Sequence, residues 1–142
     1  MKSWKTYLEE KLSVEKQEEK SGIDIDHDNE KGESKEHKRK FEEAKKGMLE
    51  FFKKRKEGAA DIARKAKAKG GPSILTYWHF VAKSQPYSEV LRAIREDRNE
   101  SFYTSKCKSI LSQLNQKTNQ QKFQRLMGQL EVYGEARAEL FG

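Results

Sequence analysis

Apolar residues recur at helical spacing along this chain of 142 residues. Between residues 37 and 69 they stand three and four positions apart, which places them on one face of a helix. This stripe has large side chains at first and mostly small ones after Gly58, so its second half should dock only weakly: Phe41, Ala44, Met48, Phe51, Phe52, Ala59, Ile62, Ala63 and Ala66. No segment alternates with period two over more than a few residues, so we predict an all-α protein.

The only dense apolar segment begins directly after the Gly-Gly-Pro sequence at residues 70–72. Glycine adopts the left-handed cap conformation easily and proline cannot continue a helical ladder, so the preceding helix should end here. Four amphipathic patterns follow, and their predicted first or capping residues are Ser73, Pro86, Asn99 and Thr118. Short turns between them are typical of a bundle. We therefore predict a long basic helical arm, residues 37–69, followed by a small C-terminal helical domain, residues 73–142, that folds without the arm.

The N-terminal segment, residues 1–20, carries a narrow apolar stripe formed by Trp4, Tyr7, Leu8 and Leu12. A helix this short and thinly apolar is not stable alone, so it should dock either on its own domain or on another protein. The large aromatic side chains favour docking in both cases. The next residues, 21–36, are polar and turn-rich, which predicts a flexible acidic linker.

One part of the linker partly matches a calcium-binding loop. Asp24, Asp26 and Asp28 stand at the first three ligand offsets of that motif. The sixth position is Asn29 where the motif needs glycine, and the twelfth is Lys35 where it needs a bidentate glutamate. No other set of ligand side chains has metal spacing, so we expect neither a metal nor a cofactor.

Charge is concentrated in the predicted arm. The chain has a formal net charge of +7, and residues 35–69 hold 14 Lys and Arg against 6 Asp and Glu. Such a helix binds nucleic acid without sequence preference, because each neutralised phosphate releases counterions. The alternative is a solvated basic helix with no partner. The candidate nucleic-acid-binding residues are Lys45, Lys46, Lys53, Lys54, Arg55, Lys56, Arg64, Lys65, Lys67 and Lys69.

The C-terminal half contains a second basic and aromatic group. Arg92, Arg95 and Arg98 are spaced three apart, so one helix face should be positive. Tyr77, Trp78 and Tyr87 stand near these charges in the sequence, and such a surface can stack bases. The same aromatic residues also suit a core, and that is the interpretation we favour.

No catalytic constellation accompanies these residues. His79 stands between two aromatic residues without a Glu-x-x-His pair, a glycine-rich phosphate loop or a Ser-His-Asp set, so we expect no enzyme. Cys107 is the single cysteine, which excludes an internal disulfide. No apolar run approaches the roughly 18 residues of a membrane span. We expect a soluble, intracellular protein that does not bind membranes.

The first ten residues, MKSWKTYLEE, resemble the capsid-targeting peptide of internal head proteins in T-even-like bacteriophages. Those peptides begin Met-Lys, carry aromatic and aliphatic residues at helical spacing, and end in a Leu-or-Ile, any residue, Glu motif that the prohead protease cuts. Residues 8–10 supply that ending here, and the resemblance covers ten residues of 142. It implies cleavage after Glu10, with Leu8 and Glu10 as processing residues, and a place in the virion head after synthesis in the host cytoplasm.

Two functional hypotheses follow from the sequence. The first is a phage-type internal or core-associated head protein, whose basic arm binds nucleic acid non-specifically among virion or scaffold proteins. The second is a structural or adaptor protein that binds no nucleic acid, and in which the lysines serve only solubility. It would dock onto partner subunits through Trp4, Tyr7, Leu8, Phe51 and Phe52.

Overall fold

The structure, a computed structural model, describes residues 4–10 and 31–142. These residues contain helices and no strand, as predicted, and a long helix precedes a helical bundle. Residues 4–10 form a short helix, and the further elements are α2 (Lys31–Lys69), the 3₁₀ turn η2 (Gly71–Ser73), α3 (Ile74–Val81), α4 (Ser84–Arg95), α5 (Glu100–Leu114) and α6 (Gln120–Phe141).

The predicted linker falls partly outside the described residues. Positions 21–30, which include Asp24, Asp26 and Asp28, are not among them, and neither are positions 11–20. The long helix already begins at Lys31, inside the range 21–36. The helical pattern of the basic segment therefore extends further toward the N-terminus than its apolar stripe indicates.

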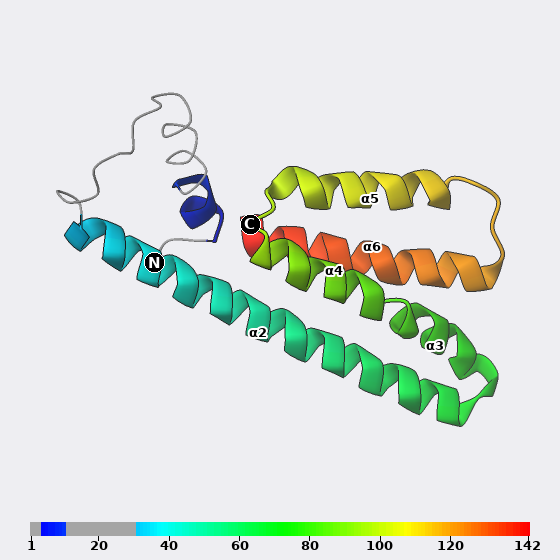
Figure 1. The fold of residues 1–142 in the computed structure, drawn as a ribbon. Helices are drawn as coiled ribbons and strands as arrows, with labels where there is room; N and C mark the ends of the chain where they lie inside the picture. The colour runs from blue at the N-terminus through cyan, green and yellow to red at the C-terminus, as the bar shows by residue number, and fades with distance from the viewer. Residues whose placement is uncertain (1–3, 11–30) are drawn as a thin grey trace.

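The long helix ends at the predicted place. Gly70 and Gly71 have φ angles of +63° and +57°, a region that favours glycine because it has no Cβ. Pro72 occupies the first turn of η2, where a missing backbone N–H costs little. The chain reverses at this point, so that α3 and α4 run back along α2 (Figure 1).

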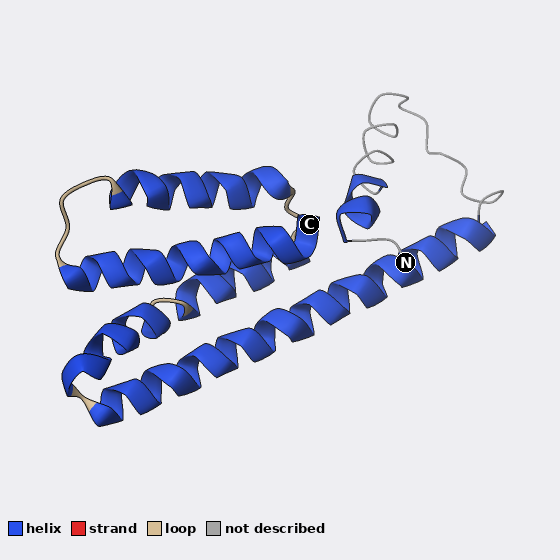
Figure 2. Ribbon diagram, turned by 180° about the vertical axis from the view of Figure 1, so that it is seen from behind, coloured by secondary structure: helices blue, strands red, loops and turns tan. Residues whose placement is uncertain are grey.

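The helices form layers, with α3 and α4 between α2 and α6, and with α5 on the outer side of α6 (Figures 1 and 2). The side chain of Phe52 is fully buried in the core, where its ring lies 6.5 Å from that of Tyr87 on α4. Ala59, Ala63 and Ala66 are also buried. The long helix is thus part of the core and does not project as an arm.

The buried alanines of α2 contradict one prediction from the sequence. We predicted weak docking after Gly58 because the side chains there are small. Small side chains instead allow two helices to approach closely, and the buried alanines are in the part of α2 that packs against α3. The large residues of α3 are all partly exposed.

The N-terminal helix docks on its own chain. The Trp4 ring stacks on that of Phe41 in α2 with centroids 5.1 Å apart, and the Tyr7 ring meets Phe41 edge-on at 6.4 Å. Trp4 and Leu8 are 2% and 1% exposed. The helix lies between the first half of α2 and the C-terminal end of α6 (Figure 1). Of the two docking alternatives, the structure shows the intramolecular one.

Helix caps agree with the sequence only in part. Asn99 precedes α5, as predicted. The cap of α6 is Asn119 and not Thr118: the Asn119 side chain accepts a hydrogen bond from the backbone N–H of Lys122 at 2.8 Å. Asn119 has extended backbone angles, which direct its side chain toward the free N–H groups of the first turn.

Candidate nucleic-acid interface

The long helix α2 divides its basic residues between two environments. Lys45, Arg55 and Lys56 make hydrogen bonds or ion pairs with residues outside α2, although Arg55 is half exposed, and the remaining candidates make none with the described residues there. The difference arises from their positions on the helix. Lys45 stands four residues after buried Phe41, and Arg55 and Lys56 stand three and four residues after Phe52, so all three share a face with the core residues.

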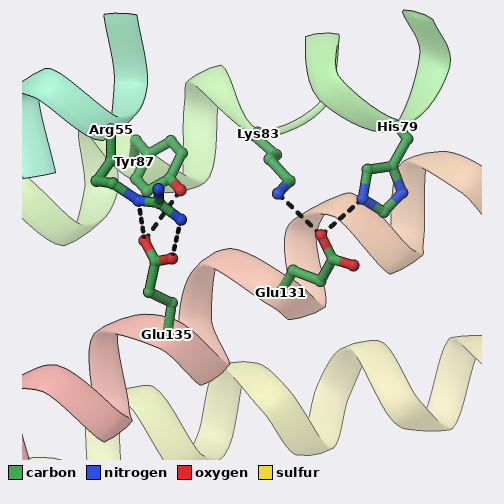
Figure 3. Close-up of polar contacts among 6 residues, drawn as sticks. All are labelled: Arg55, His79, Lys83, Tyr87, Glu131 and Glu135. Carbon is green, nitrogen blue, oxygen red and sulfur yellow. Dashed lines mark hydrogen bonds and ion pairs between the residues drawn. The ribbon is translucent and has the colours of Figure 1, made fainter. Parts of the chain in front are cut away.

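Arg55 is held by a carboxylate from the far end of the sequence. Its guanidinium makes a two-point contact with Glu135 on α6, in which Nε lies 3.1 Å from Oε1 (Figure 3). The Tyr87 hydroxyl on α4 donates to the same carboxylate oxygen at 3.1 Å. The hydrogen bond with Glu135 raises the pKa of Arg55. Burial, and then the Glu135 charge, raise the pKa of Tyr87 to about 12. This group ties α2, α4 and α6 together.

Two further basic side chains on α2 have structural partners. The Lys45 ammonium lies 2.9 Å from Asp97, and both side chains are about six-sevenths buried. Asp97 has a φ angle of +57° two residues after the end of α4, so this ion pair stabilises a turn whose backbone conformation is uncommon for a residue other than glycine. Lys56 donates to the Ser88 hydroxyl on α4 at 2.8 Å. These contacts reduce the availability of Lys45 and Lys56 to an external phosphate.

The other candidates on α2 form an exposed basic surface. Arg64 pairs with Asp61 on the same helix, and the Lys67 ammonium lies 5.6 Å from the centre of the Tyr77 ring. Five lysines, which we call the outer lysines, are exposed and make no hydrogen bond or ion pair within the described part of the chain: Lys46, Lys53, Lys54, Lys65 and Lys69.

Acidic residues share this surface unevenly. Glu43 and Glu50 are exposed near the middle of α2, where they offset some of the positive charge. Between residues 53 and 69 only Glu57 and Asp61 oppose eight Lys and Arg, and Asp61 is already paired. The net positive charge is therefore concentrated between residues 53 and 69, in the C-terminal half of α2.

The second basic face is weaker than its sequence suggests. Arg92, Arg95 and Arg98 are exposed, but Glu96 lies 4.0 Å from Nε of Arg92 and 3.3 Å from Nε of Arg98. The neighbouring aromatic residues do not form one stacking surface, since Tyr87 is buried and engaged by Glu135. This face offers less uncompensated charge than the outer lysines.

His79 belongs to a polar contact between α3 and α6. Its Nε2 lies 2.6 Å from Glu131 Oε2, and the ammonium of buried Lys83 lies 2.8 Å from the same oxygen (Figure 3). Partial burial raises the pKa of Glu131, but hydrogen bonds from Lys83 and His79 outweigh this effect and hold the pKa below its usual value. The arrangement attaches α3 to α6.

The residues proposed for docking and processing lie mostly inside the molecule. Trp4, Tyr7, Leu8 and Phe52 are buried within the chain itself, whereas Phe51 is 37% exposed. The Glu10 carboxylate lies 3.2 Å from Nε2 of His37 on α2. In this structure only Phe51 of the five docking candidates is exposed to a partner subunit.

Comparisons with protein-family models, with curated proteins and with solved structures find no match to this chain. Among the described residues, no three His, Cys, Asp or Glu side chains gather where they could hold a metal ion. The described helices also include none that combines the length and the apolar character needed to span a membrane.

Proposed function

We propose that the protein binds nucleic acid without sequence preference along the exposed side of α2. The observation that carries this proposal is the set of outer lysines, which are exposed and unpaired within the described residues. They extend from residue 46 to residue 69, which corresponds to about 35 Å of helix at 1.5 Å per residue. A basic row of this length suits contact with several phosphates and carries no groups arranged to recognise base edges.

The test compares two double variants that remove the same charge from neighbouring positions on one helix. Lys53→Gln with Lys54→Gln removes two outer lysines, and Arg55→Gln with Lys56→Gln removes two side chains that already have partners. If about five phosphates are contacted, log affinity for duplex DNA falls against log salt with a slope of about −4 to −5.

The first variant should flatten this slope by about two units and leave the melting temperature unchanged. The variant Arg55→Gln with Lys56→Gln should lower the melting temperature and change the salt slope less. Its binding must be measured at a temperature below its own melting transition. Fluorescence anisotropy over a salt series supplies the slopes, and circular dichroism the melting temperatures. Equal slopes for the two variants would contradict the division of the basic residues into outer lysines and residues with partners on other helices. If the wild-type protein does not bind duplex DNA at about 50 mM salt, the nucleic-acid proposal is wrong and the adaptor hypothesis is favoured.

We further propose that this binding takes place in a phage head, and the support for it is the resemblance of residues 1–10 to capsid-targeting peptides. A protease that reads an extended Leu-x-Glu segment cannot reach Leu8 while that side chain is 1% exposed in a docked helix. Cleavage after Glu10 should therefore require the N-terminal helix to detach from α2.

Phe41→Ala tests this requirement without changing the peptide. The substitution removes the ring on which Trp4 stacks, so a T-even-type prohead protease should release a product beginning at Lys11 several times faster than from the wild-type protein. Mass spectrometry of a time course identifies the new N-terminus and the rate. Leu111→Ala, a loss of apolar volume at an exposed position on α5, is the matched control. No cleavage of either protein, or a product beginning elsewhere, would argue against the head-protein proposal.

A further inference from the structure

A hollow lies beside the reversal between α2 and α3, at the C-terminal end of the long helix. It has a volume of about 240 Å³, which is room for a phosphate group. The described residues that line it include no carboxylate. They are two lysines, two hydroxyl residues and an apolar edge: Ile62, Lys65, Ala66, Lys69, Ser73 and Thr76.

Neither lysine makes an ion pair with any residue that the structure describes. Lys65 and Lys69 are four residues apart, so both side chains extend from the same side of α2 over the hollow. Like charges at this spacing repel each other. Asp61 stands four residues before Lys65 but is paired with Arg64. An anion in the hollow would remove this repulsion.

The two hydroxyl residues come from the other side of the reversal. Gly70 and Gly71, with their positive φ angles, turn the chain so that η2 and the first turn of α3 lie against the last turns of α2. Ser73 occupies the capping position of α3, yet its side chain makes no capping hydrogen bond. Thr76 is exposed at the rim of the hollow. Both hydroxyl groups are therefore available to donate to an oxyanion.

We propose that this hollow binds one phosphate group of a nucleic-acid backbone. The ammonium groups of Lys65 and Lys69 neutralise its charge, and the hydroxyl groups of Ser73 and Thr76 donate hydrogen bonds to its oxygens. The inference rests on the nucleic-acid binding proposed above. The hollow would fix one phosphate group in place on a surface that otherwise attracts phosphates only through its overall charge. Free inorganic phosphate carries the same charge and the same oxygen acceptors, so it could bind the same groups.

The deciding variant is Ser73→Ala with Thr76→Ala in the full chain, because it removes two donors and no charge. Affinity for duplex DNA should fall at least tenfold, since the loss of even one hydrogen bond to a charged group weakens binding by about that factor. The salt slope should stay unchanged, because the number of displaced counterions is the same. Ser109→Ala with Ser112→Ala, two exposed serines on α5, is the matched control and should bind like the wild type.

Inorganic phosphate is the second probe, followed by shifts of the backbone amide signals of residues 62–76 in nuclear magnetic resonance spectra. The shifts should disappear in Ser73→Ala with Thr76→Ala and in Lys65→Gln with Lys69→Gln. They should persist in Lys53→Gln with Lys54→Gln, although both lysine pairs flatten the DNA salt slope by a similar amount.

The outcomes separate the two proposals. If the wild type binds DNA and Ser73→Ala with Thr76→Ala binds equally well, the hollow is not a phosphate site and the proposed function stands. If the wild type binds no DNA but shows phosphate shifts that the variant loses, the proposed function is wrong and the hollow takes free phosphate. If neither probe binds, both proposals are overturned.

Discussion

Replacing Phe52 by Ala is expected to lower the free energy of unfolding by about 3–5 kcal/mol. Phe52 is 0% exposed, and its ring packs near Tyr87 on α4 and edge-on against Phe51. Truncation removes most of a large apolar side chain and leaves a cavity that rigid helices on both sides cannot fill. Since whole domains are stable by only about 5–15 kcal/mol, a large fraction of the native stability should be lost.

The adjacent residue is a natural control. Phe51 has the same side chain on the same helix but is 37% exposed, so Phe51→Ala should cost about 1 kcal/mol or less. Urea denaturation followed by circular dichroism measures both differences, and slopes that match the wild type would show that two-state unfolding is retained. Similar losses for the two variants would mean that α2 does not pack with the orientation seen here.

The burial of Phe52 also changes what is expected of residues 73–142. From the sequence, this part should fold alone, because it contains most of the large aliphatic residues. In the structure, α3 and α4 pack against α2, whose buried contributions include Phe52, Ala59 and Ala63. A fragment that lacks α2 would expose one whole side of the middle layer, so we expect it to need α2 for cooperative folding.

Local chemistry made several features of the fold predictable. The spacing of apolar residues identified the helices, and the Gly-Gly-Pro sequence at 70–72 marked the end of the long helix to within one residue. These signals involve residues that are three or four positions apart, so they can be recognised without knowledge of the tertiary contacts. The all-helical character followed from the same signals.

The division of the basic residues needed more than composition. Lys45, Arg55 and Lys56 were grouped with the outer lysines because charge was counted by segment. Their spacing from Phe41 and Phe52 indicates the buried side of the helix, and this signal was available in the sequence. Their partners were not predictable, since Glu135 lies 80 residues from Arg55 and Asp97 lies on a turn defined by tertiary packing.

The close approach of α3 to α6 was also beyond the reach of the sequence. Gly128 lies in the middle of α6, where glycine is normally unfavourable compared with alanine. A Cβ atom at this position would lie 2.1 Å from the backbone carbonyl oxygen of His79, well inside contact distance. The absence of a side chain at Gly128 therefore permits the close approach of α3 to α6. The need for glycine at this position is evident only when the positions of both helices are known.

Gly128→Ala is accordingly expected to lower the free energy of unfolding by about 2 kcal/mol, even though alanine favours the helix. The atom that a methyl group would meet belongs to the backbone of α3, so it cannot turn aside as a side chain would. The helices must separate, which also stretches the contacts of His79 and Lys83 with Glu131.

Gly134→Ala, six residues further along α6, should instead raise the free energy of unfolding. Gly134 is exposed and a Cβ there would meet nothing within 4 Å, so the variant should gain about 0.5–1 kcal/mol from a less flexible unfolded chain and better helix propensity. Urea denaturation of the two variants measures this contrast on one helix with one substitution. A stabilising Gly128→Ala would show that α3 does not approach α6 as described. The attachment of the lysine-rich end of α2 to the rest of the bundle would then need another explanation, because α3 is the element that lies between them.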